Sequence, residues 1–167
     1  MSSVLVRAGA VDDLPALTDL YNHYVLHDHA TFDVEPFTVD ARRAWFDHYA
    51  ESGPHRLLVA ELAGIVAGYA TSSAHRAKPA YATSVETTVY CAPDVAGKGV
   101  GSALYAALFE LLAGENVHRA YAGVALPNEA SVRLHERFGF RELGTFREVG
   151  RKHGRWIDVR WFERAMP

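Results

Sequence analysis

The sequence predicts an α/β fold, with a mixed, mostly antiparallel twisted sheet flanked by about four helices. Two kinds of segment support this fold: short apolar runs typical of strands, and longer runs whose apolar residues recur every three or four positions. Their order is strand, two helices, three strands, helix, strand, helix and two strands. The 167 residues are 49% hydrophobic and 22% charged, and they contain no repeat or low-complexity tract, so we expect a single domain over 1–167.

In the first half of the chain, two helices are expected between an N-terminal strand and a hairpin. The expected elements are a strand at 4–7, a helix that follows Asp12 and Asp13, and a second helix that begins at Thr38 or Asp40 and ends at 52–54. Strands at 57–62 and 65–71 flank Ala63-Gly64, a pair typical of hairpin turns. Residues 72–80 are polar and are expected to form an irregular turn.

The second half is expected to alternate strands and helices and to end in a hairpin. Apolar residues at i, i+3, i+4, i+7 and i+8 from Val100 indicate the clearest helix, which Gly114 ends. Asn128 is expected to cap a helix whose buried face includes His135, and Gly139 to end that helix in the left-handed conformation. The expected strands are 84–91, 119–125, 142–149 and 156–164, with a turn at 150–155.

The charges limit the classes of partner. Lys and Arg total 17 against 20 Asp and Glu, and this net charge of −3 argues against a nucleic-acid partner, because such binding depends on phosphate neutralisation. The distribution is uneven: residues 1–75 carry 4 basic and 10 acidic side chains, and 76–167 carry 13 and 10. The second part is therefore the better place for a small anionic ligand.

The cysteine count and the hydropathy pattern indicate the compartment. Cys91 is the one cysteine of the sequence, which excludes an intrachain disulfide and favours a reducing compartment. No apolar run approaches the roughly 18 residues of a membrane span. The first residues also lack the basic and then apolar layout of a signal peptide, so we expect a cytoplasmic protein without membrane contact.

A glycine-rich turn at 93–102 connects the strand at 84–91 to the clearest helix. Gly97, Gly99 and Gly101 let the backbone curl so that successive N–H groups converge at a helix N-terminus, which suits a phosphate group. A tight strand-to-helix turn without a ligand is the alternative. The segment is neither a P-loop, since Gly99 follows Lys98, nor a dinucleotide fingerprint, since Ser102 occupies the place of the third glycine.

The turn resembles the acetyl-CoA loop of the GNAT acetyltransferases. Gly99-Val100-Gly101 and the preceding Lys98 match that loop, whereas Ala96 stands where the family usually has Arg or Gln. Nearly the whole chain is similar to the phosphinothricin and methionine sulfoximine N-acetyltransferase branch, through segments 21–24, 31–32, 85–90, 126–128, 131–136 and 152–158.

The resemblance implies a GNAT fold, acetyl-CoA as cosubstrate, no metal, and direct attack of the amino group of a small amino-acid-like substrate on the thioester. It also implies a homodimer, and a hairpin at 150–158 that closes either the site or the dimer interface. The residues implied in acetyl-CoA binding are Thr88, Val89, Tyr90, Ala96, Gly97, Lys98, Gly99, Val100, Gly101, Ser102 and Asn128.

Glu86 and His135 are the candidate catalytic residues. Glu86 lies in an otherwise uncharged strand, where its carboxylate points either into a cleft or outward to solvent. His135 lies on an apolar helix face, where a lone histidine is usually a core residue, and Asn128 by pattern alone is a helix cap. The resemblance makes Glu86 the general base and His135 the proton donor to the coenzyme A thiolate.

Basic and aromatic side chains supply the candidate substrate contacts. Arg76 and Lys78 stand in the irregular stretch before Glu86, either as solvated charges or as partners of a substrate carboxylate. The resemblance favours the latter, with Phe32 and Tyr24 as walls of the amine pocket.

Three alternatives to this function stay open. The chain acetylates another amine, such as a polyamine, an aminoglycoside or a protein N-terminus, or it is a CoA-binding module without chemistry. A metal-binding protein is the remote third, suggested by His23, His27 and His29, for which no further ligand set is evident.

Overall fold

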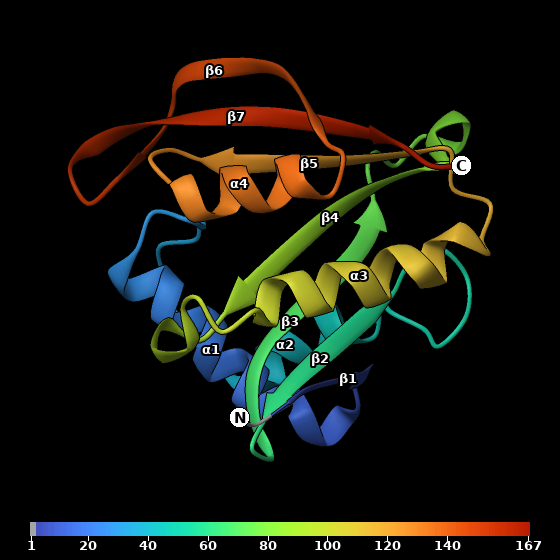
Figure 1. Ribbon diagram of the computed structural model, residues 1–167. Helices are drawn as coiled ribbons and strands as arrows, with labels where there is room; N and C mark the ends of the chain where they lie inside the picture. The colour runs from blue at the N-terminus through green and yellow to red at the C-terminus, as the bar shows by residue number, and fades with distance from the viewer. Residues whose placement is uncertain (1–2) are drawn as a thin grey trace.

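The computed structural model describes residues 3–167 as a seven-stranded sheet with helices on both faces (Figure 1). The strand order is β1-β2-β3-β4-β5-β7-β6. The strands are β1 Val4–Ala8, β2 Leu57–Leu62, β3 Ile65–Ala74, β4 Ser84–Cys91, β5 Arg119–Ala125, β6 Arg141–Lys152 and β7 Arg155–Ala165. The helices are α1 Leu14–His27, α2 Val39–Phe46, α3 Val100–Ala113 and α4 Glu129–Arg137. This is the predicted mixed α/β fold.

The sheet is buried on both faces because its central strands are apolar on both. On β2, Leu57 and Val59 pack with α1, whereas Leu58 and Ala60 belong to the core formed with α3 and α4. Successive side chains of a strand point to opposite faces, so the two helix layers cover opposite sides of the sheet. Figure 1 shows α3 and α4 in front of the sheet and α1 and α2 behind it.

The one parallel pair of the described sheet, β4 with β5, creates the opening that matters for function. The pair is in register only from Ser84↔Arg119 to Glu86↔Tyr121, whereas the other neighbouring strands are antiparallel. Beyond Glu86 the strands separate, and Figure 1 shows β4 running obliquely away from β5 and β7. Past that point the main chain of β4 has no strand partner on its β5 side among the described residues.

Local turn signals predict several boundaries correctly. Ala63 and Gly64 form the β2–β3 turn with φ of 53° and 77°, the left-handed pair of a two-residue hairpin loop. The predicted strands 84–91 and 119–125 match β4 and β5, and α3 begins at Val100. Gly139 ends α4 with a φ of 79°.

Three predicted boundaries are wrong. Helix α2 ends at Phe46 and not at 52–54, because the Asp47 N–H makes the last bond to a carbonyl four residues back. The N–H groups of His48 and Tyr49 bond three residues back, to Trp45 O and Phe46 O. Strand β3 continues through residues 72–74, since these pair with β4. The turn expected at 150–155 is only His153-Gly154, and β6 and β7 pair as far as Lys152↔Arg155.

No helix among residues 3–167 combines the length and the apolarity that crossing a bilayer requires.

Candidate active site

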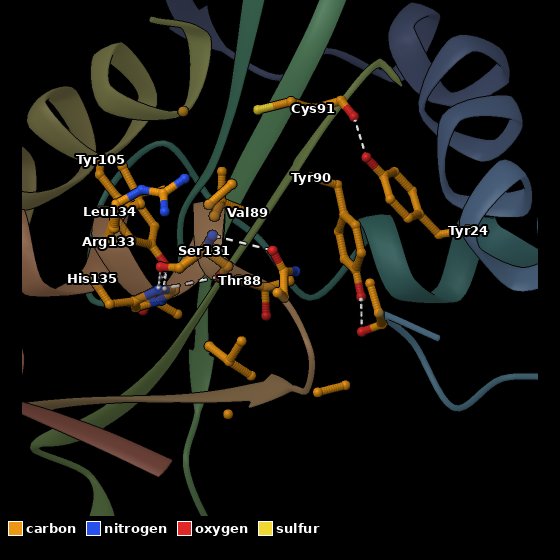
Figure 2. Close-up of a pocket in the computed structure, with 18 of the residues that line it drawn as sticks. Tyr24, Thr88, Val89, Tyr90, Cys91, Tyr105, Ser131, Arg133, Leu134 and His135 are labelled. Atoms are coloured by element: carbon orange, nitrogen blue, oxygen red, sulfur yellow. Dashed lines mark hydrogen bonds between the residues drawn. The ribbon is translucent and has the colours of Figure 1, made fainter. Parts of the chain in front are cut away.

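A cavity of about 890 Å³ opens where β4 and β5 separate. Its wall combines β4, the glycine turn, the N-terminal part of α3, α4, the end of β5, β7 and the loop after α1 (Figure 2). The predicted site residues on this wall are Tyr24, Phe32, Glu86, Thr88, Val89, Tyr90, Ala96, Gly97, Gly99, Val100, Gly101, Ser102, Asn128 and His135. Lys98, Arg76 and Lys78 do not belong to the described wall.

Two of the three glycines of the turn adopt a left-handed backbone conformation, which L side chains rarely adopt. Gly97 and Gly99 have φ of 77° and 79°, and apart from the adjacent residues no described atom lies within 4 Å of a Cβ built on either residue. Gly99 is the N-cap of α3, so the first-turn N–H groups of that helix lack intrahelical acceptors. These N–H groups and the helix dipole favour an anion at this end of the cavity.

Gly101 has a different role from the other two glycines. A Cβ on Gly101 would lie 3.3 Å from Leu134 Cδ2 and 3.6 Å from Cys91 Sγ. Its lack of a side chain therefore lets α3 approach α4 closely.

Two arginines on α4 supply positive charge beside the same turn. Arg133 and Arg137 line the cavity, and Arg137 Nη1 donates to Ser102 Oγ at 2.9 Å. They lie four residues apart and thus on one helix face, a signal available in the sequence. Ala96 contributes no charge, and Arg133 and Arg137 are the Lys or Arg side chains of the described wall.

Asn128 caps α4 as its pattern predicts. Its Oδ1 accepts the N–H of Ser131 at 3.1 Å. Because Asn128 also lines the cavity, a contact with a ligand is compatible with the cap.

His135 is 3% exposed and both of its ring nitrogens are engaged. Nδ1 donates to the Ser131 carbonyl at 2.7 Å, and Nε2 accepts from the Tyr105 hydroxyl at 2.9 Å (Figure 2). The ring stacks on Phe162 with centroids 5.5 Å apart. Burial lowers the pKa of His135, although the hydrogen bond to Ser131 opposes the shift, so the ring is neutral near pH 7.

Glu86 lies on β4 at the last register pair with β5. Its side chain is 33% exposed and lines the cavity. Burial raises the pKa of Glu86, and the positive charge of Arg76 partly opposes the shift. A carboxyl group with a raised pKa at the mouth of a cleft is suited to accept a proton.

Arg76 and Lys78 lie on the segment between β3 and β4. Arg76 Nη1 donates to the neighbouring His75 carbonyl at 2.9 Å, and the side chain is exposed. Lys78 precedes the short 3₁₀ turn Pro79–Tyr81. Of the two, Arg76 is the one whose charge acts on Glu86.

Tyr24 and Phe32 line the end of the cavity nearest the N-terminal part of the chain. The Tyr24 hydroxyl donates to the Cys91 carbonyl at 2.5 Å, and burial raises the pKa of Tyr24 to about 12. The ring of Phe32 lies against Gly150 of β6. Lys152 Nζ donates to the carbonyls of Tyr24 at 3.1 Å and Thr31 at 2.8 Å, so the β6–β7 hairpin holds the Phe32 loop over the cavity.

Several residues of this site escape prediction from sequence patterns. Tyr105 looks like an ordinary core position of α3, and it reaches His135 only because α3 and α4 pack closely. Trp161 of β7 faces the cavity across Gly123, where a Cβ would lie 3.2 Å from its ring. The tertiary neighbours of both determine their place, and no local motif marks either.

The histidines suggested as metal ligands do not converge. The rings of His23 and His27 lie 5.3 Å apart, whereas His29 Nε2 bonds to the Pro127 carbonyl. Among residues 3–167, no group of three or more His, Cys, Asp or Glu side chains is placed to hold a metal ion.

Known proteins share this sequence and fold. The chain is 62% identical over 167 residues to a phosphinothricin N-acetyltransferase of Streptomyces coelicolor, covering 99% of this chain and 98% of that protein. It is 35% identical over 161 residues to an L-methionine sulfoximine/L-methionine sulfone acetyltransferase of Pseudomonas aeruginosa, covering 96% of this chain and 94% of that protein.

A solved structure with a bound ligand has the same fold. The GNAT superfamily phosphinothricin acetyltransferase of Sinorhizobium meliloti, solved in complex with acetyl-CoA, superposes with a TM-score of 0.93 at 30% identity, covering 99% of this chain and 89% of that one. The model of the acetyltransferase (GNAT) domain matches residues 6–161. The strand opening, the glycine turn and these likenesses agree, and the chain belongs to the GNAT acetyltransferase family.

Proposed function

We propose that this enzyme transfers the acetyl group of acetyl-CoA to the α-amino group of a small amino-acid-like substrate of the phosphinothricin, methionine sulfoximine or methionine sulfone type. The positive charge of Arg76, which acts on Glu86 from the segment between β3 and β4, carries the proposal. An α-amino acid presents an ammonium group and a carboxylate next to each other, and these two side chains complement that pair. The relatives named for these substrates support the same class.

The chain's own groups would perform the transfer in one attack. Glu86 takes a proton from the substrate ammonium, and the freed amine attacks the thioester carbonyl carbon. The β4 main chain at Thr88–Tyr90 has no strand partner on its β5 side among the described residues, and from that side it supplies N–H donors toward the carbonyl oxygen as negative charge develops there. The C–S bond then breaks, and the second proton that the nitrogen loses as the amide forms passes through water to the leaving thiolate. Glu86 returns the first proton to solvent, and the products are the N-acetyl substrate and coenzyme A in its thiol form.

The phosphate end of acetyl-CoA would lie at the glycine turn. The N–H groups of Gly99, Val100, Gly101 and Ser102 would bind the pyrophosphate, and Arg133 and Arg137 would add charge. Asn128 and the β4 main chain would hold the pantetheine arm between them. The β4–β5 opening between these groups supports this placement.

A thiol-release assay with acetyl-CoA over a panel of amines tests the function. The panel contains phosphinothricin, methionine sulfoximine, methionine sulfone, a polyamine, an aminoglycoside and a peptide with a free N-terminus. Turnover confined to the first three compounds supports the proposal. Preference for a cationic amine, such as the polyamine or the aminoglycoside, would contradict the proposed amino-acid-like substrate class. Acetyl-CoA binding without thiol release on any amine would indicate a non-catalytic module.

Reversal of the charge at Arg76 tests the substrate carboxylate contact. We expect Arg76→Glu to raise KM for the amino-acid substrate by about tenfold or more, because a charge-assisted hydrogen bond becomes a repulsion. KM for acetyl-CoA should stay unchanged. Lys78→Glu is the matched control, because the charge of Lys78 is close in sequence and is not among the causes of the Glu86 pKa shift. A gain in turnover with Arg76→Glu would indicate a cationic substrate.

The role of His135 is tested by two substitutions of different size. The neutral ring opposes direct proton donation to a thiolate, and its contacts favour a structural role. We expect His135→Ala to lower the free energy of unfolding by about 2–4 kcal/mol, because it leaves a cavity and removes the partners of Tyr105 and Ser131. His135→Gln keeps a polar group near the Nε2 position and should retain most of kcat. A stably folded Gln variant whose kcat falls about 100-fold would instead support the proton-donor role that the resemblance implies.

We also propose that the enzyme is a cytoplasmic homodimer, as the resemblance implies. Exposed apolar side chains on the β6–β7 hairpin support an interface there, with Leu143 51%, Phe146 59% and Trp156 60% exposed.

A further inference from the structure

A histidine stands beside the proposed catalytic base. His75 directly follows β3, and its Nδ1 lies 3.7 Å from Glu86 Oε2. The two residues meet because β3 and β4 pair in the register Ser73↔Glu86 and Ala74↔Val85. The backbone N–H of His75 donates to the Ser84 carbonyl at 3.3 Å. This bond holds the main chain that follows β3 to β4.

The orientation of the His75 ring is fixed by aromatic neighbours. It stacks on Tyr121 of β5 with centroids 4.4 Å apart and planes at 24°. Tyr81 lies edge-on at 6.0 Å and Trp161 at 6.5 Å. With 14% of its side chain exposed, the ring has little freedom to turn Nδ1 away from the carboxylate.

Nδ1 of His75 is a ring nitrogen without a hydrogen bond in the described chain, and this lack needs an explanation. It is buried and has no hydrogen-bond partner among residues 3–167. A buried polar atom without a partner destabilises the fold, so such an atom facing an acid calls for a functional explanation. Burial lowers the pKa of His75 and the charge of Arg76 adds to the shift, so the ring is neutral with one N–H. The facing carboxylate favours placing that hydrogen on Nδ1.

We propose that His75 is a positioning residue for Glu86: its Nδ1–H donates to Oε2 in the catalytic complex and turns Oε1 toward the substrate ammonium. The proposal rests on the proposed function of Glu86 as the base. The transferred proton goes from the ammonium to Oε1, and His75 keeps its own proton throughout. Hydrogen bonds of this kind are often long without substrate and shorten when it binds, which accounts for the 3.7 Å separation.

The surroundings of the pair define the expected pH dependence. The phenols of Tyr121 and Tyr81 and the indole of Trp161 lie around the His75 ring, and the guanidinium of Arg76 is hydrogen-bonded to the His75 carbonyl. Of these, Arg76 carries the charge, and it acts on both partners. A hydrogen bond donated to a carboxylate stabilises its charged form, so loss of the His75 donor should raise the pKa of Glu86 further.

Two substitutions separate the hydrogen bond from the packing. His75→Phe keeps the stack on Tyr121 and removes the donor, whereas His75→Asn places an amide N–H near the Nδ1 position. We expect His75→Phe to lower kcat by about tenfold or more, with KM for both substrates unchanged, and to move the acid limb of the kcat/KM profile to higher pH. His75→Asn should restore most of kcat and the wild-type limb.

Further results decide against the proposal. Wild-type kcat and an unmoved acid limb in His75→Phe would overturn it, and so would equal losses in both variants, because those would reflect packing alone. His75→Leu gives a second donor-free variant if the Phe variant does not fold.

Glu86→Gln separates this proposal from the proposed function. In that background His75→Phe should cause no further loss. If Glu86→Gln is inactive while His75→Phe has wild-type kcat and an unmoved acid limb, Glu86 stays the proposed base and only the proposed role of His75 is excluded. A fully active Glu86→Gln removes the base and His75 with it.

Discussion

Glu86→Gln is expected to lower kcat by about 100-fold or more while KM for acetyl-CoA changes little. The amide has the shape of the carboxylate but cannot accept the ammonium proton. Glu86 lies at the β4–β5 divergence, away from the glycine turn, so the cofactor contacts should survive the change. Steady-state kinetics with phosphinothricin or methionine sulfoximine as acceptor measure both constants.

The same variant should be more stable than the wild type at neutral pH. Because burial raises the pKa of Glu86, the folded state is penalised when this group ionises, and its contribution to stability falls as pH rises from the ordinary glutamate range through the raised pKa. Glutamine does not ionise. The difference in stability between the two proteins should therefore disappear when both are melted at acid pH. Over the same pH range, kcat/KM of the wild type should fall as the pH is lowered, because Glu86 becomes protonated.

Glu163→Gln is the matched control. Glu163 lies on β7 in register with Tyr121, has a side chain 15% exposed, and pairs with Arg141 away from the cavity. It should keep wild-type kcat. Wild-type kcat in Glu86→Gln would exclude Glu86 as the base, and equal losses in both variants would point to a general effect of removing a sheet carboxylate.

The features that could be predicted from sequence are those marked by local signals. The left-handed glycines of the turn, the Asn128 cap and the start of α3 at Val100 depend on the conformational preferences of a few consecutive residues. These signals locate the end of the site at which we propose that the phosphates bind. Glu86 also lies in its expected strand. Its charge makes it a candidate there, because the other side chains of that strand are uncharged.

The features that could not be predicted depend on strand register and on packing. His75 faces Glu86 only because β3 extends to Ala74 and pairs with β4, and 72–80 had instead been expected to form an irregular turn. Trp161 enters the cavity through the β5–β7 register, across Gly123. For His135 the pattern favours a core residue and the resemblance implies a proton donor, and the contact that bears on the choice comes from Tyr105, 30 residues away.

Gly99→Val is expected to raise KM for acetyl-CoA by about 100-fold or to abolish saturation. Gly99 has a φ of 79°, and β-branched side chains are strongly disfavoured there because Cβ crowds the backbone. Apart from the adjacent residues, no described atom lies within 4 Å of the built Cβ, so the effect comes from backbone conformation. The chain would leave the left-handed conformation, and the first-turn N–H groups of α3 would no longer converge on the pyrophosphate.

Gly64→Val distinguishes loss of the cofactor site from general loss of stability. Gly64 has a φ of 77°, and apart from the adjacent residues no described atom lies within 4 Å of its built Cβ, but it lies in the β2–β3 turn outside the cavity wall. Both variants should melt at lower temperature than the wild type, and only Gly99→Val should weaken acetyl-CoA binding, as measured by titration calorimetry. Equal affinity in the two variants would mean that the glycine turn does not hold the phosphates. Because the strain is matched, a difference in affinity between them reports the contribution of the converging N–H groups.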